Sequence, residues 1–200
     1  MECVVTKIET VAAALTTPRD KSGFTRRSFL ATLAVGGLGL VKLPRMLRAM
    51  EGSRSLGFHH LHTGESLDVE YFALGDYVPN ALAEVNHVLR DWRDGTIHSI
   101  DPALLDLLHE LHAATGTRHP FQVICGYRSP KTNAMLASHS EAVSPRSLHM
   151  TGKAIDIRLP DVPLARLRDV ALGLRRGGVG YYPDPANNFV HVDTGRVRHW

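Results

Sequence analysis

The sequence predicts an α+β domain in which a small, mostly antiparallel sheet has helices packed on one face. Three observations support this prediction. Several short segments are apolar or alternate apolar with polar residues, as strands do. Longer segments have apolar residues at helical spacing, and Gly, Pro and Asn separate the segments. No internal repeat is present, and a hydrophobic content of 44% in 200 residues suffices for one core.

Residues 1–52 are expected to form an export signal and linker, and residues 53–200 the folded domain. The segment Thr25–Leu30 reads Thr-Arg-Arg-Ser-Phe-Leu, a twin-arginine signature, and the apolar run Phe29–Val41 follows it. This run is too short for a membrane span. We therefore expect transport to the periplasm by the twin-arginine export machinery. No clear cleavage site is present, so an uncleaved membrane anchor and a buried N-terminal helix stay open as alternatives.

The charge and the cysteines exclude some functions. The net charge is only +3, and no basic stripe or recognised nucleic-acid module is present, so we expect no nucleic-acid partner. Cys3 lies in the leader, which leaves Cys125 alone in the domain and rules out a disulfide there. Cys125 ends an apolar run and is expected to be a small buried residue rather than a nucleophile.

The first half of the domain is predicted to contain a hairpin followed by two helices. Residues 56–62 and 67–72 form the hairpin, and its three histidines fit polar positions of an edge strand better than metal ligands. The first helix spans Pro79–Arg93. The second begins at Asp101-Pro102, a capping residue followed by proline at the first helical position, and ends at Gly116.

The second half is predicted to complete the sheet. Its expected elements, in chain order, are a central strand at Phe121–Cys125, a short helix at Ser129–Ala137, a loop at Ser138–Arg146 that borders a cleft, a strand at Lys153–Leu159, a helix at Pro163–Arg176, and strands at Val179–Tyr182 and Phe189–Val192.

Two histidines and an aspartate stand out in this half. By strand alternation, Asp156 projects from the face opposite its apolar neighbours, and so does His191 on the last strand. His149 precedes Gly152 in a turn that can fold back over the strand of Asp156. Two imidazoles and a carboxylate, with a fourth position left to water, are typical of one catalytic zinc ion. The alternative is that these are ordinary hydrogen-bonded histidines, since the chain has 12.

These residues resemble the motifs of the zinc peptidases of murein, a group that includes D-alanyl-D-alanine carboxypeptidases, murein endopeptidases and the Hedgehog-type domain. The similarity is closest to the periplasmic MepK-like murein endopeptidases and runs from about Leu56 to Trp200. It implies zinc ligands at His149, Asp156 and His191, and a substrate- or oxyanion-binding arginine at Arg128. The motifs are Cys125–Pro130, Ser147-x-His149-x-x-Gly152-x-Ala154-x-Asp156, Gly177–Pro183 and Phe189–Arg198.

Arg128 also has a role that its position suggests. An arginine at the end of a strand beside a metal site can hold a carboxylate or carbonyl group through its planar fork of donors. The alternative is a structural salt bridge.

The general base is harder to assign. Many relatives carry Glu-x-x-His at the last ligand, but the residue three before His191 is Asn188. The preferred candidate is Asp193, on the same strand face as His191. In a swapped assignment, suggested by relatives with His-x-His, His191 is the base and Asp193 the third ligand. In a third, Asp193 only orients His191.

The resemblance implies a zinc metallopeptidase that cleaves cross-linked peptide stems of bacterial cell-wall peptidoglycan. Two other functions stay open. One is a carboxypeptidase that removes terminal D-alanine, and the other is a zinc-stabilised module that binds murein without hydrolysis.

Overall fold

The computed structural model describes residues 52–140 and 143–200. The export signal predicted for residues 1–52 therefore lies, except for Gly52, outside the described residues. Among the helices that are described, none has the length and apolar character needed to cross a membrane.

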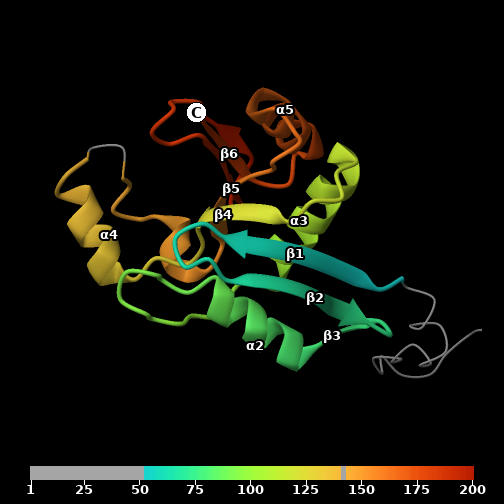
Figure 1. Ribbon diagram of the computed structural model, residues 1–200. Coiled ribbons are helices and arrows are strands. Elements are labelled where there is room, and N and C mark those ends of the chain that lie inside the picture. The colour runs from blue at the N-terminus through green and yellow to red at the C-terminus, as the bar shows by residue number, and fades with distance from the viewer. Residues whose placement is uncertain (1–51, 141–142) are drawn as a thin grey trace, which may run out of the picture. The chain divides into compact units, whose positions relative to one another are not determined.

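One sheet of eight strands organises the fold (Figure 1), in the order β3-β2-β1-β4-β5-β7-β6-β8. Five neighbouring pairs are antiparallel, whereas β1–β4 and β6–β8 are parallel. The α+β class is thus confirmed, but the sheet is mixed and larger than expected. The strands are β1 (Arg54–His60), β2 (Ser66–Ala73), β3 (Asp76–Tyr77), β4 (Phe121–Cys125), β5 (Ala154–Arg158), β6 (Gly178–Tyr182), β7 (Phe189–Asp193) and β8 (Arg198–His199).

The predicted hairpin forms as β1 and β2, but β1 is not an edge strand. It lies between β2 and β4, because a parallel pairing places Phe58 beside Phe121 and His60 beside Val123. The edge-strand interpretation of its histidines is therefore wrong. Burial lowers the pKa of His60 to about 4, so this side chain is neutral at physiological pH.

The helices are α2 (Pro79–Val88), α3 (Pro102–Thr115), α4 (Pro130–Ala137) and α5 (Leu164–Leu174). The ends of α3 are as predicted: the Asp101 carboxylate accepts a hydrogen bond from the Ala103 N–H, and Gly116 ends the helix with φ 72°. Helix α2 ends at Val88, earlier than predicted. Asp91, which was expected to lie in the helix, is outside it, and its carboxylate accepts hydrogen bonds from the backbone N–H groups of Arg93 and Ser129.

Among the described residues, one hydrophobic cluster joins helices α2, α3 and α5 to the sheet. Helices α3 and α5 lie side by side (Figure 1), and α5 also contacts β6 and β7. On β5 and β7 the apolar residues Ile155, Ile157, Val190 and Val192 belong to the cluster, whereas Asp156 and His191, which alternate with them, do not. The alternation predicted from the sequence thus directs the candidate site residues away from the core.

Asp106 ties three strands to helix α3. Its carboxylate accepts hydrogen bonds from Arg54 Nη1 on β1 at 2.7 Å, Tyr71 Oη on β2 at 3.0 Å and Tyr77 Oη on β3 at 2.7 Å. Burial opposes the charge of Asp106, but these donors outweigh it and lower its pKa. Its contribution to stability is therefore complete above the unfolded-state pKa of about 4 and is lost as the pH falls below that value.

We expect Asp106→Ala to lower the free energy of unfolding by about 2–3 kcal/mol at pH 7, because it leaves the buried Tyr71 hydroxyl and the partly buried Arg54 guanidinium without their acceptor. Urea denaturation measures this loss. The control is Asp169→Ala on α5, whose ion pair with the adjacent Arg168 is exposed and whose loss should cost less than about 0.5 kcal/mol. Equal effects of the two substitutions would contradict the role given to Asp106.

Candidate active site

His149 is held in a short 3₁₀ helix, η1 (Leu148–Thr151), just before β5. The Ser147 hydroxyl caps this helix by accepting a hydrogen bond from the His149 N–H. Gly152 ends it with φ 65°, and a Cβ at this position would overlap with the carbonyl oxygen of Ser99. One ring nitrogen of His149, Nδ1, lies 2.7 Å from the Gly126 carbonyl oxygen. The other, Nε2, points over β5.

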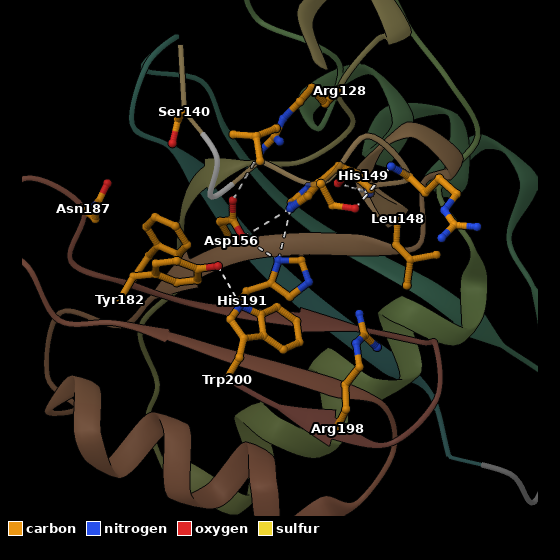
Figure 2. Close-up of a pocket in the computed structure, with 15 residues that line it drawn as sticks. Arg128, Ser140, Leu148, His149, Asp156, Tyr182, Asn187, His191, Arg198 and Trp200 are labelled. Carbon is orange, nitrogen blue, oxygen red and sulfur yellow. Dashed lines mark hydrogen bonds and ion pairs between the residues drawn. The ribbon is translucent and has the colours of Figure 1, made fainter. Parts of the chain in front are cut away.

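Sheet register brings the other two predicted ligands to the same place. Asp156 on β5 pairs directly with His191 on β7. His149 Nε2 lies 3.2 Å from His191 Nδ1 and 3.3 Å from Asp156 Oδ1, and the last two atoms are 2.8 Å apart. Figure 2 shows the three side chains converging on one point from η1, β5 and β7. All three residues are buried.

The three donor atoms fit a zinc ion in their chemistry and spacing. Two imidazoles and a carboxylate are common zinc ligands, and donors about 2.0–2.1 Å from a tetrahedral ion lie about 3.3 Å apart. Burial opposes the charge of His149, but Asp156 and Cys125 outweigh it and raise the pKa of His149 to about 10. Burial likewise opposes the charge of Asp156, but His149 and His191 hold its pKa well below the ordinary range. The electrostatic surroundings of the three side chains thus stabilise a positive charge at this site.

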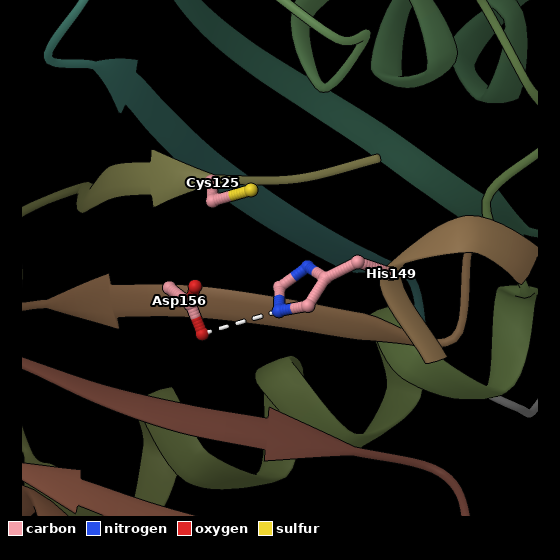
Figure 3. Close-up of side chains that lie close together, drawn as sticks. All are labelled: Cys125, His149 and Asp156. Carbon is pink, nitrogen blue, oxygen red and sulfur yellow. Dashed lines mark ion pairs between the residues drawn. The ribbon is translucent and has the colours of Figure 1, made fainter. Parts of the chain in front are cut away.

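Cys125 is buried, as expected, but it lies closer to this site than the sequence suggested (Figure 3). A register shift between Val123 and Cys125 places Cys125 opposite Asp156. Ligand atoms of Cys125, His149 and Asp156 lie within 4.8 Å of one another, which makes them a second possible ligand set. This set is looser than the first, whose donors are separated by no more than 3.3 Å.

Asp193 lies on the other side of the His191 ring and is completely buried. Its Oδ2 is 3.2 Å from His191 Nε2 and accepts a hydrogen bond from Arg198 Nη2 at 2.7 Å. Its Oδ1 accepts from Arg198 Nη1 and from the backbone N–H groups of Gly178 and Gly195 at 2.8–3.1 Å. Burial opposes its charge, yet His191 and Arg198 keep the pKa of Asp193 well below the ordinary range.

These contacts bear on the three roles considered for Asp193. Both of its oxygen atoms are engaged, and the carboxylate contacts the nitrogen of His191 that faces away from His149 and Asp156. The geometry therefore favours the role in which Asp193 orients His191 over the preferred role of general base, and also over the role of third metal ligand.

Arg128 follows β4 and lies beside Asp156. Its Nη2 is 3.8 Å from Asp156 Oδ2 and 3.6 Å from the Cys125 sulfur, and its Nη1 is 3.4 Å from Asn133 Oδ1. Its Nε is buried and has no hydrogen-bond partner among the residues that the structure describes. The guanidinium is thus positioned over the site with weak contacts and with donor capacity to spare.

The site lies at the bottom of a pocket of about 370 Å³. The loop predicted to border a cleft lines it through Ser140 and Ser144. Sequence reasoning assigned no role to three other lining residues, Tyr182, Arg198 and Trp200. Tyr182 and Arg198 belong to two of the motifs, but their spacing gave no sign of a pocket, and Trp200 follows β8, which has only two residues.

Comparison with known families defines the class of the protein, a peptidase. The family described as "Peptidoglycan L,D-endopeptidase MepK" matches residues 48–200, and the chain belongs to this family. The resemblance found in the sequence is thereby confirmed.

Two relatives show how far the similarity extends. The chain is 44% identical to the "Peptidoglycan L,D-endopeptidase MepK" of Escherichia coli K12 over 184 residues, which is 90% of this chain and 100% of that protein. It is 41% identical to the "Probable peptidoglycan L,D-endopeptidase MepK" of Haemophilus influenzae over 174 residues, which is 84% of this chain and 92% of that protein.

Proposed function

We propose that this chain is a zinc-dependent endopeptidase that hydrolyses cross-linked peptide stems of bacterial peptidoglycan. The observation that carries the proposal is the convergence of His149, Asp156 and His191 at the bottom of an open pocket. Membership of the MepK family, whose named relatives are peptidoglycan L,D-endopeptidases, supports the substrate class.

His149 Nε2, Asp156 Oδ1 and His191 Nδ1 would hold a single zinc ion. A bound zinc ion supplies Lewis-acid chemistry, since it polarises a carbonyl group and makes water more acidic. Burial packs the three side chains in place, so the donors are held together before an ion binds.

The remaining roles belong to residues around these donors. Arg128 is suited to bind the carbonyl oxygen of the scissile peptide bond or a nearby carboxylate of the stem, because it lines the pocket beside Asp156 and makes only weak contacts there. Asp193, held by Arg198, fixes the ring of His191 so that Nδ1 faces Asp156. This assignment replaces the base role that the sequence favoured.

We also propose that the protein acts in the periplasm and arrives there by the twin-arginine route, with residues 1–52 as its signal and linker. The twin-arginine signature at Thr25–Leu30 supports this proposal. Contact with the membrane would then be limited to the signal segment in the uncleaved form.

Digestion of purified peptidoglycan sacculi tests the function. We expect the zinc-loaded protein to convert dimeric muropeptides into monomers, and chelation of zinc to stop the reaction. Products with stems shortened by a terminal D-alanine would indicate a carboxypeptidase instead. Retention on sacculi with no new product would overturn the enzyme proposal in favour of a binding module.

A further inference from the structure

One wall of the pocket is aromatic and partly exposed. Trp200 is 49% exposed, although several contacts hold its side chain. Its indole N–H donates a 2.7 Å hydrogen bond to the Tyr182 hydroxyl, and the Tyr182 ring stacks on Phe189 with centroids 4.6 Å apart. The indole also lies 4.9 Å from the Arg198 guanidinium carbon. The three aromatic residues therefore form one connected wall.

The backbone holds this wall in place. The Trp200 N–H donates to the Val179 carbonyl oxygen, and its own carbonyl oxygen accepts from the Tyr181 N–H, which fixes the residue along β6. Gly180 lets the indole approach closely, since a Cβ there would lie 2.8 Å from the ring atom Cε2 of Trp200. The exposed aromatic face is thus rigid before any ligand arrives, which reduces the entropy lost on binding.

The wall adjoins the candidate metal donors. The Trp200 and His191 rings are 5.2 Å apart. Figure 2 shows Tyr182 and Trp200 on one side of Asp156 and His191, with Arg128 on the other side. A peptide bound with its scissile bond at the donors would therefore lie between an apolar wall and a guanidinium.

We propose that Trp200 and Tyr182 bind the aliphatic side chain of the stem residue next to the scissile bond, an inference that rests on the proposed function. Chain geometry argues for the peptide part of the substrate rather than the sugars. A residue spans about 3.3–3.6 Å, so a group that contacts a ring 5.2 Å from His191 lies within about two residues of the bond to be cut. The aromatic faces suit an aliphatic chain, and Arg128 on the opposite side suits a carboxylate of the bound peptide.

Steady-state kinetics of Trp200→Ala and Trp200→Phe tests the inference. The substrates are a cross-linked muropeptide dimer and the same dimer with its sugars removed. We expect Trp200→Ala to raise KM about 10-fold on both substrates and to leave kcat and zinc content nearly unchanged, because the wall contributes ground-state binding. Trp200→Phe should recover most of the loss. The control Val197→Ala removes an exposed apolar side chain outside the pocket and should leave KM unchanged.

Three results would overturn the inference. An unchanged KM would remove Trp200 from substrate binding. A lower kcat or zinc content at constant KM would make it a support for His191. An effect confined to the sugar-bearing substrate would assign the wall to the glycan.

A binding measurement separates this inference from the proposed function. Calorimetry gives the dissociation constant of the sugar-free dimer for wild type and Trp200→Ala, each also in the His149→Ala background, where no hydrolysis is expected. If the wild type hydrolyses nothing, the proposed function fails. A larger dissociation constant in Trp200→Ala would still support the role of the aromatic wall in binding the peptide. Equal dissociation constants would show that Trp200 does not bind the peptide, whether or not the protein is active.

Discussion

Replacing His149 by alanine is expected to abolish zinc binding and to lower peptidoglycan hydrolysis by at least about 1000-fold. The substitution removes one of the three converging donors and leaves only Asp156 and His191 of this set to bind zinc. Zinc content of the purified protein, measured by elemental analysis, and release of monomeric muropeptides are the two readouts.

Two further variants sharpen this experiment. The exposed His87, which contacts Arg90 and Glu65, provides a matched control, and His87→Ala should keep both zinc and activity. Cys125→Ser tests the second ligand set, and we expect it to retain zinc because the tighter set does not include the sulfur. Loss of zinc in Cys125→Ser with zinc retained in His191→Ala would assign the ion to Cys125, His149 and Asp156.

Replacing Asp193 by asparagine is expected to weaken zinc binding by about 10- to 100-fold, because the carboxylate that orients His191 is lost. Activity should fall as well and should recover in part when zinc is added in excess. Competition with a chromogenic chelator measures the affinity. Because Arg198 acts through the same carboxylate, Arg198→Met should change the affinity in the same direction.

The general-base role makes the opposite prediction for this variant. If Asp193 accepts a proton during catalysis, Asp193→Asn will keep its zinc affinity and lose activity that excess zinc does not restore. Asp184→Asn is the control, since Asp184 lies in the turn between β6 and β7 and its carboxylate accepts a local hydrogen bond from the Ala186 N–H.

The elements that depend on local chemistry were predictable from the sequence. Strand β4 and the caps of α3 fall where apolar runs, Asp101 and Gly116 placed them. The end of α2 was not predictable, because it depends on Asp91 receiving the Ser129 N–H from 38 residues further along the chain. The position of β1 inside the sheet has the same cause, a parallel pairing with the distant β4.

The candidate site likewise has one part that the sequence predicted and another part that it could not predict. Strand alternation and the turn at Gly152 placed His149, Asp156 and His191 where they could meet, and the resemblance to murein peptidases implied one site, as the distances show. The surroundings of Asp193 could not be derived from its own strand, since its partners are Arg198 on β8 and a backbone N–H of Gly178 on β6. Residues that support a site through long-range contacts leave little periodic signal in a sequence.

The close packing around Asp193 limits which sequences can build this site. A Cβ at Gly177 would overlap with the Asp193 carbonyl oxygen, one at Gly178 would lie 2.5 Å from the carboxylate and one at Gly195 2.9 Å from it. Random mutagenesis under selection for cell-wall cleavage should therefore tolerate almost no replacement at these three positions, whereas Gly173, whose Cβ would meet nothing within 4 Å, should accept many. Such an experiment would find the surroundings of the buried Asp193 carboxylate from sequence positions alone, because the positions that accept only glycine would be those packed against it.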